Sequence, residues 1–185
     1  MSTVSLQEIR EVYARADLIY SKEQIETAYD RMAAAITDSL RDSNPLVIAI
    51  MVGGLIPAGQ LLPRLDFPLQ MDYLHATRYR GATRGGELQW LARPAYPLQD
   101  RVVLLIDDIL DEGVTLAEIC EFCREAGARR VYTAVLLNKS HKRKNGLQAD
   151  FVGFEVGDRY VFGCGMDYKG YLRNVPGIYA IPEED

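Results

Sequence analysis

The sequence predicts an α/β fold in which helices flank a central, mostly parallel sheet. Apolar runs at 46–52, 102–106 and 131–137 lack the alternation of a strand with one exposed face, so we expect strands buried on both faces. Stretches with helical periodicity lie between these runs, as in parallel α/β sheets. The 185 residues, 48% hydrophobic and 25% charged, suffice for one domain with a full core.

The first half of the chain is expected to form helices at 5–19 and 21–42, a strand at 46–52, a helix at 55–65 and strands at 68–79 and 88–91. Ser21 and Gln24 form a capping box that starts the second helix, and Asn44-Pro45 ends it. The last two strands predict a hairpin whose tip, 78–86, contains three arginines and three glycines. We expect a mobile basic loop suited to close over a polyanion; a plain disordered tip is the alternative.

The second half is expected to form a strand at 102–106, a helix at 113–126 and strands at 131–137, 151–155, 159–163 and 178–181. Leu116, Ile119, Cys120 and Cys123 give the helix an apolar face, and Gly127 caps its end.

The strand at 102–106 runs directly into an acidic turn, which carries the strongest functional signal. Asp107 and Asp108 follow the strand, Asp111 comes next, and Gly113 and Thr115 open the helix. N–H groups at a helix N-terminus bind phosphate, glycine permits close approach, and threonine adds a hydroxyl donor. Carboxylates beside a phosphate are favourable if they hold a hard cation and sugar hydroxyls. The turn predicts such a site; an ordinary helix start with acids that favour the macrodipole is the alternative.

Two other strand ends supply polar groups. Gly53-Gly54, between a strand and a helix, predicts a second anion cradle. Asn138 and Lys139 come at the end of the strand at 131–137, where open α/β sheets bind ligands.

The composition excludes several classes of protein. A net charge of −5 argues against a general nucleic-acid binder, and we interpret the basic run at 141–144 as a solvated loop. The three cysteines, Cys120, Cys123 and Cys164, lack the second pair that a metal site needs and predict buried thiols in a reducing compartment. Without a signal-like or membrane-spanning run, we expect a cytoplasmic protein with no membrane partner.

Residues 102–115 resemble the phosphoribosyl-pyrophosphate motif of type I phosphoribosyltransferases: an apolar strand, two acids, two apolar residues, Asp, a small residue, Gly, any residue and Thr. The resemblance implies that family's α/β fold, with a small hood and a flexible hairpin loop beside the mostly parallel sheet. It also implies one domain over 1–185, with a core at about 40–155 and a hood built from N-terminal residues and about 156–185.

Three positions depart from the family's pattern. Val52 stands where a lysine usually precedes Gly53-Gly54, which removes a charge and keeps the backbone role. Glu112 replaces a small hydroxyl residue and Val114 replaces a lysine, so the 5′-phosphate loop is less cationic.

Over 47–181 the order of motifs is similar to that of the hypoxanthine-guanine phosphoribosyltransferases. The distinguishing segments are 136–139, 150–155, 160–161, 166–168 and Arg173. The resemblance implies that Lys139 donates to the purine 6-oxo group and its N7 edge, Tyr160 stacks on the base, and Val161 reads its edge through the backbone. It further implies that Asp167 lies beside the base and binds a second magnesium, and that Arg173 pairs with pyrophosphate.

The resemblance implies a purine salvage enzyme that transfers 5-phosphoribosyl from phosphoribosyl pyrophosphate to hypoxanthine or guanine, giving IMP or GMP and pyrophosphate. Asp111 is the expected base, and Tyr79, after an Arg78 that replaces the usual serine, is the expected catalytic-loop residue. Asp107 and Asp108 are expected to hold ribose hydroxyls and Mg²⁺. The expected phosphoribosyl-pyrophosphate ligands are Asp107, Asp108, Asp111, Glu112, Gly113, Val114, Thr115, Gly53, Gly54 and Arg173. The family forms dimers or tetramers, so we expect a homodimer or homotetramer.

Two alternatives stay open. A regulator that keeps this fold and binds nucleic acid would show a basic face or an added domain, whereas this chain is acidic. A transferase for another base is the second alternative. Lys139 and Tyr160 disfavour a pyrimidine, but the sequence does not rank hypoxanthine, guanine and xanthine, which differ at the 2-position.

Overall fold

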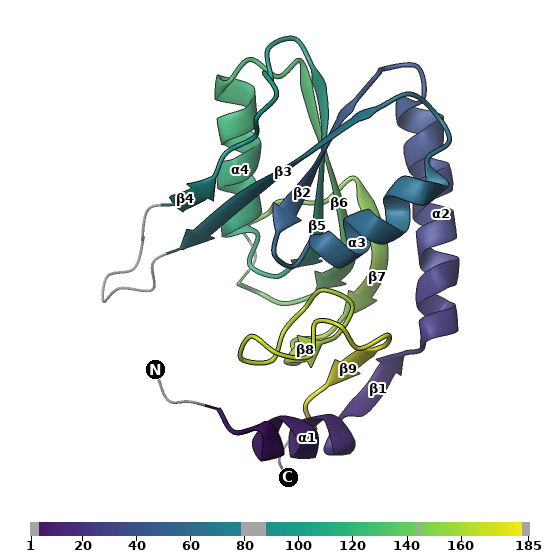
Figure 1. Ribbon diagram of the computed structural model, residues 1–185, viewed down its shortest axis with the longest axis vertical. Helices are drawn as coiled ribbons and strands as arrows, with labels where there is room; N and C mark the ends of the chain where they lie inside the picture. The colour runs from purple at the N-terminus through teal and green to yellow at the C-terminus, as the bar shows by residue number, and fades with distance from the viewer. Residues whose placement is uncertain (1–3, 79–87, 144, 183–185) are drawn as a thin grey trace.

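The computed structural model of the protein describes residues 4–78, 88–143 and 145–182. A central sheet contains, in spatial order, β4 (Leu88–Ala92), β3 (Gln70–Arg78), β2 (Leu46–Met51), β5 (Val102–Leu110), β6 (Arg130–Lys139) and β7 (Phe151–Val156) (Figure 1). Neighbouring strands are parallel except β3 and β4, which form an antiparallel hairpin at the edge. The predicted mostly parallel α/β fold is confirmed.

The helices are α1 (Leu6–Arg15), α2 (Lys22–Leu40), α3 (Leu55–Leu61) and α4 (Val114–Glu125), with a 3₁₀ turn at Leu62–Arg64. In Figure 1, α2 and α3 lie on one side of the central sheet and α4 on the other. Successive residues of β5 enter different cores: Leu104 and Ile106 pack with α2 and α3, while Val103 and Leu105 pack with α4. This burial on both faces explains why the strand is an unbroken apolar run.

A second, smaller sheet joins the two ends of the chain. Its antiparallel strands are β1 (Asp17–Tyr20), β9 (Ile178–Ala180) and β8 (Val161–Phe162), in that order. The helix predicted at 5–19 is therefore wrong at its end, because α1 stops at Arg15. Asp17 pairs instead with Ala180 of β9. This pairing between two segments distant in the sequence overrides the local helical pattern.

Strand β5 is longer than predicted. The strand expected at 102–106 continues to Leu110, because β5 pairs with β6 as far as Asn138. Asp107 and Asp108 therefore lie within the sheet, and the turn begins only after Leu110. Conversely, the strand predicted at 159–163 shortens to β8, since the chain turns at Gly163, whose φ is +102°.

Several local predictions are confirmed. Ser21 Oγ accepts from the Gln24 N–H, and Gln24 Oε1 accepts from the Ser21 N–H, which completes the capping box. The hairpin pairs up to Arg78 and Leu88, while its tip, with Tyr79, lies outside the described residues. Within the described ranges, no helix is both long and apolar enough to cross a membrane.

Candidate active site

The acidic residues of the predicted site lie at the carboxyl end of β5, beside the end of β6. Because β5 and β6 are parallel and Leu110 pairs with Asn138, Asp111 emerges next to Lys139. The helix α4 begins three residues after Asp111. The sheet edge thus brings together the predicted base, the predicted purine ligand and the predicted phosphate turn.

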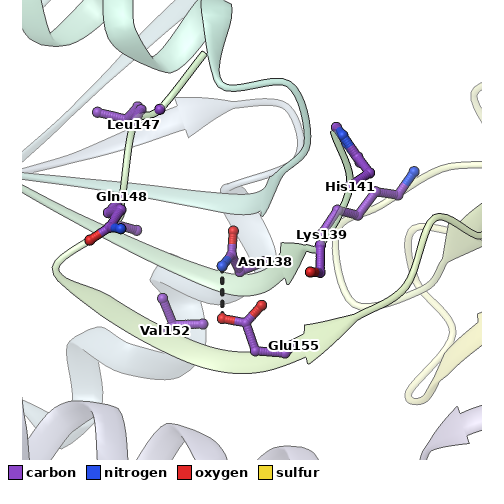
Figure 2. Close-up of a pocket in the computed structure, with 10 residues that line it drawn as sticks. Asn138, Lys139, His141, Leu147, Gln148, Val152 and Glu155 are labelled. Atoms are coloured by element: carbon purple, nitrogen blue, oxygen red, sulfur yellow. Dashed lines mark hydrogen bonds between the residues drawn. The ribbon is translucent and has the colours of Figure 1, made fainter. Parts of the chain in front are cut away.

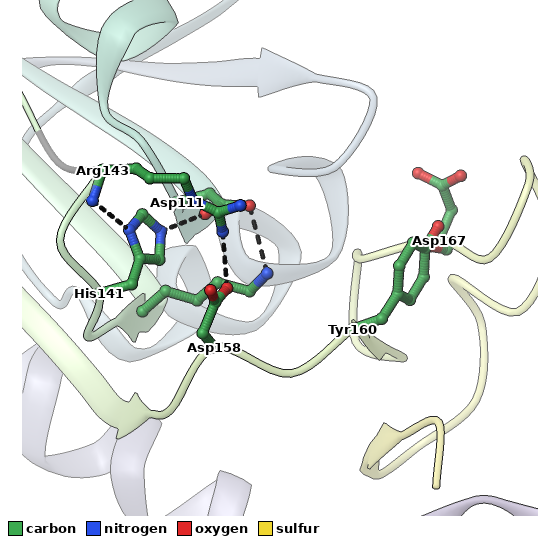
Figure 3. Close-up of polar contacts among 7 residues, drawn as sticks. Asp111, His141, Arg143, Asp158, Tyr160 and Asp167 are labelled. Carbon is green, nitrogen blue, oxygen red and sulfur yellow. Dashed lines mark hydrogen bonds and ion pairs between the residues drawn. The ribbon is translucent and has the colours of Figure 1, made fainter. Parts of the chain in front are cut away.

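Asp111 forms the centre of a polar cluster (Figure 3). Lys139 Nζ lies 3.2 Å from Asp111 Oδ2, and His141 Nε2 lies 2.6 Å from Asp111 Oδ1. Partial burial of the Asp111 carboxyl acts to raise its pKa, but the His141 hydrogen bond and the Lys139 charge prevail and lower it. Asp111 is therefore ionised at neutral pH and able to accept a proton.

His141 was missed by the sequence analysis, which placed it in a solvated loop. Its side chain is only 4% exposed, whereas Lys142 and Arg143 are exposed as predicted. The interpretation of the basic run is wrong for this one residue. The sequence offered one indication that His141 belongs to the site, namely its position two residues after Lys139. Proximity in sequence does not predict which side chains of a loop are buried.

Asp107 and Asp108 differ in their surroundings. Asp108 is buried, while Asp107 is partly exposed and its Oδ1 accepts from the Asp108 N–H at 2.9 Å. Desolvation raises the pKa of both carboxyls, and the neighbouring Asp108 charge raises that of Asp107 further. Two adjacent carboxylates of this kind favour an arriving cation or hydroxyl donor, because either relieves their repulsion.

Two glycines make room for the Asp108 side chain. A Cβ on Gly53 would lie 2.2 Å from Asp108 Oδ2, and a Cβ on Gly165 would lie 2.9 Å from Asp108 Cβ. Gly165 also has a φ of +113°, a backbone conformation that favours glycine. The absence of a side chain at Gly53 therefore allows the acidic end of β5 to approach, whereas anion binding by Gly53 and Gly54 stays a prediction.

Arg173 links the smaller half of the site to β5. Its Nη2 lies 2.5 Å from Asp167 Oδ1, and its Nη1 lies 3.7 Å from Asp108 Oδ2. Nη1 also donates to the carbonyl of Gly165. The residue predicted to pair with pyrophosphate thus bridges two of the predicted metal ligands.

The predicted phosphate turn leads directly into α4. Gly113 occupies the N-cap position with a φ of +83°, followed by the half-buried Val114 and Thr115. Glu112 is exposed. Asn145 covers the turn from the segment after β6: its N–H donates to the Glu112 carbonyl at 3.0 Å.

The predicted base-stacking residue lies in the C-terminal part of the site. Tyr160 is 50% exposed, and its hydroxyl donates to the Asp167 carbonyl at 3.2 Å. In Figure 3, Tyr160 and Asp167 lie together, apart from Asp111 and His141. Val161 is buried and pairs with Ala180, so its backbone position is fixed by the small sheet.

A pocket of about 390 Å³ opens beside Lys139 and His141 (Figure 2). Asn138 Nδ2 donates to Glu155 Oε1 at 2.7 Å across the ends of β6 and β7, and Leu147 and Gln148 form another side. Among the described residues, its lining includes none of the phosphate-turn residues 107–115. It is therefore adjacent to, and not identical with, the predicted phosphate site.

Asp107, Asp108 and Asp167 are the predicted ligands of Mg²⁺. In the part of the chain that the structure describes, no three His, Cys, Asp or Glu side chains gather into a metal-binding group. Mg²⁺ is usually held by one or two carboxylates together with substrate phosphates and water, so Asp107 and Asp108 fit it chemically. Asp167 already accepts from Arg173 and from the Gly170 N–H at 2.6 Å. Arg173 therefore competes with a metal ion for this carboxylate.

The predicted phosphate turn, the paired glycines and the paired carboxylates lie at one sheet edge, an arrangement that suits an enzyme acting on a phosphorylated sugar. A family model described as "Phosphoribosyl transferase domain" matches residues 16–169, and the chain belongs to that family of enzymes. Within this family, relatives of the chain are hypoxanthine-guanine phosphoribosyltransferases. One of them, the hypoxanthine-guanine phosphoribosyltransferase of Bacillus subtilis, is 34% identical over 162 residues, 87% of this chain and 90% of the relative.

Solved structures with the same fold are also phosphoribosyltransferases. A hypoxanthine phosphoribosyltransferase from Staphylococcus aureus superposes with a TM-score of 0.88 at 26% identity, over 96% of this chain and 97% of that one. A structure described as a hypoxanthine-guanine-xanthine phosphoribosyltransferase superposes with a TM-score of 0.82 at 26% identity, over 90% and 97% of the two chains. The predicted fold of type I phosphoribosyltransferases is confirmed.

Proposed function

We propose that the protein transfers the 5-phosphoribosyl group of phosphoribosyl pyrophosphate to hypoxanthine or guanine, giving IMP or GMP and pyrophosphate in purine salvage. The observation that carries the proposal is the pair formed by Lys139 and Asp111, with 3.2 Å between Nζ and Oδ2. It combines a cationic donor with an ionised acceptor at one sheet edge. A 6-oxopurine needs both.

Lys139 and Asp111 have complementary tasks. The 6-oxo oxygen accepts a hydrogen bond, so the Lys139 ammonium suits it, while the amino group of adenine would oppose that ammonium. Asp111 Oδ2 takes the proton that the purine loses as the new glycosidic bond forms. Tyr160, half exposed beside Asp167, offers an aromatic face on which the base stacks.

The phosphoribosyl group is assigned to the strand ends of β2 and β5. The 5′-phosphate binds the N–H groups of Gly113, Val114 and Thr115 at the start of α4. Asp107 and Asp108 hold the ribose hydroxyls. Gly53-Gly54 and Arg173 bind pyrophosphate, and Arg173 exchanges its contact with Asp167 for the anion.

Mg²⁺ is the proposed cofactor, and Asp107 and Asp108 would hold it, with Asp167 as the proposed ligand of a second ion. The ion would neutralise charge on the pyrophosphate leaving group. Side chains of the protein perform the other steps of the proposed reaction: Lys139 orients the base, Asp111 holds the proton, and Arg173 retains the leaving group.

The division of the chain is part of the proposal. We assign a single domain with a core at about 40–155 and a hood from the N-terminal residues and about 156–185, because the six-stranded and three-stranded sheets divide near these positions. A cytoplasmic homodimer or homotetramer, without nucleic-acid or membrane partners, is likewise proposed from the family and the acidic composition.

The experiment that tests the function is an assay with phosphoribosyl pyrophosphate, Mg²⁺ and each of hypoxanthine, guanine, xanthine, adenine and uracil. We expect turnover with hypoxanthine or guanine and none with adenine or uracil. Adenine as the preferred base would contradict the role of Lys139. Xanthine is included because one structural relative is a hypoxanthine-guanine-xanthine phosphoribosyltransferase. Xanthine differs from the other two bases at the 2-position, which Lys139 is not expected to contact.

A further inference from the structure

His141 lies where a loop residue would normally face solvent. It follows Lys139 by two residues, just beyond the end of β6, yet its side chain is only 4% exposed. The next residues, Lys142 and Arg143, are exposed. Burial of a polar imidazole requires hydrogen-bond partners, and His141 has one on each ring nitrogen.

These partners determine the tautomer of His141. The backbone N–H of Arg143 donates to His141 Nδ1 at 3.1 Å, so Nδ1 carries no proton. A neutral imidazole with a bare Nδ1 carries its proton on Nε2. Nε2 lies 2.6 Å from Asp111 Oδ1, so His141 donates to the carboxylate (Figure 3).

The two oxygens of Asp111 therefore have different partners. Oδ1 accepts from His141, which is itself fixed by the backbone, whereas Oδ2 is 3.2 Å from the flexible ammonium of Lys139. These are the charged or titratable side chains that contact Asp111 from β6 and the connection after it. Arg143 pairs with Asp158 at 2.6 Å.

We infer that His141 is a positioning residue for the general base: it anchors Asp111 Oδ1 and so presents Oδ2 to the purine. The inference rests on the proposed function, in which Asp111 takes the purine proton. An anchored oxygen matters because the Asp111 side chain is 46% exposed, and a half-exposed carboxylate can rotate unless a fixed partner holds it. Lys139 cannot supply the anchor, since the same ammonium is needed at the 6-oxo group.

The first test measures the tautomer in the wild-type protein. The chain has two histidines, His75 and His141, so ¹⁵N spectra of imidazole-labelled protein are assigned with one His75→Gln variant. We expect His141 to be protonated on Nε2 and bare on Nδ1. The reverse tautomer would overturn the inference without any variant at the site.

The second test compares three variants. His141→Phe keeps the ring size without a donor and should lower kcat about 10- to 100-fold, with little change in KM for phosphoribosyl pyrophosphate. It should also move the acidic limb of the kcat profile to higher pH, because the lost hydrogen bond normally lowers the pKa of Asp111. His141→Gln, which retains an N–H donor, should recover most of the activity. Lys142→Ala, an exposed neighbour, should behave as wild type.

A double substitution separates this inference from the proposed function. In an Asp111→Asn background, His141→Phe should cause no further loss of kcat, because nothing remains to be positioned. A full additional loss would reveal a merely structural role and overturn the inference. If Asp111→Asn alone retains wild-type kcat, the base assignment fails. If Asp111→Asn is slow but His141→Phe is within about two-fold of wild type, only the role of His141 fails.

Discussion

Lys139 Nζ and Asp111 Oδ2 lie 3.2 Å apart, so the proposed purine donor and the proposed base form an ion pair with each other. Lys139 is the more buried partner, with a side chain 10% exposed against 46% for Asp111. A purine that accepts from Lys139 and gives its proton to Asp111 would contact both groups at once, and Lys139 would then exchange part of its contact with Asp111 for the 6-oxo oxygen.

Replacing Asp111 should affect turnover far more than binding. Asp111→Asn keeps the size of the side chain and its contact with Lys139, but it removes the proton acceptor. We expect kcat to fall by roughly two to four orders of magnitude. Calorimetric titration with IMP should show nearly wild-type affinity. A variant with near wild-type kcat would contradict the assignment of Asp111 as the base.

Replacing Lys139 should weaken binding of the purine and change binding of phosphoribosyl pyrophosphate much less. Lys139→Ala removes a charge-assisted hydrogen bond, so the KM for hypoxanthine should rise by a factor equivalent to about 1.5–3 kcal/mol. The KM for phosphoribosyl pyrophosphate should change much less. Lys142→Ala, in the exposed residue of the same segment, is the matched control. A change confined to phosphoribosyl pyrophosphate would mean that Lys139 binds phosphate.

A methyl group at Gly53 should disturb the acidic strand end. The added Cβ would lie 2.2 Å from Asp108 Oδ2, so the carboxylate must move. We expect Gly53→Ala to raise the KM for phosphoribosyl pyrophosphate roughly 10- to 100-fold, since small displacements at a site have effects of this size. Gly59→Ala in α3 is the control, because its Cβ would meet no atom within 4 Å. It should leave the kinetics unchanged and stabilise the protein by about 0.5–1 kcal/mol.

Glu112 should weaken the hold on the 5′-phosphate. It is a carboxylate beside the α4 N-terminus, but it is exposed, so solvent screens its repulsion. We expect Glu112→Thr to tighten IMP binding by about 0.3–1 kcal/mol at low salt, to lower the KM for phosphoribosyl pyrophosphate, and to leave turnover unchanged or slower.

The control for Glu112 is Glu125→Thr, which removes the same charge from the last turn of α4. Calorimetry at low and high ionic strength should show that the gain at position 112 shrinks with salt. Equal affinities of wild type and Glu112→Thr at low salt would show that this side chain points away from the phosphate.

The lowered pKa of Asp111 has a consequence for stability. A carboxyl whose pKa is lower in the folded protein contributes stability above its unfolded pKa, about 3.9, and loses it as the pH falls through the folded value. Urea unfolding of wild type and Asp111→Asn should therefore show a stability difference above pH 4 that shrinks below it. A difference independent of pH would mean that the carboxyl charge is not involved.

The local sequence determined the elements that depend on neighbouring residues. The run at 102–106 is buried on both faces, the Ser21 capping box starts α2, and Gly113 opens α4 with a positive φ. The order of strand, acids and helix start also places Asp107, Asp108 and Asp111 toward the carboxyl end of β5, although pairing with β6 extends this strand to Leu110.

Only the tertiary structure decided the features that join distant parts of the chain. Residues 17–20 form a strand because β9, at the other end of the sequence, offers a partner. Arg173, in the segment between β8 and β9, reaches Asp108, and His141 turns inward because Asp111 and the Arg143 backbone satisfy both its nitrogens. Periodicity and spacing report which residues are apolar or flexible, but a polar side chain is buried only where folding supplies its hydrogen-bond partners.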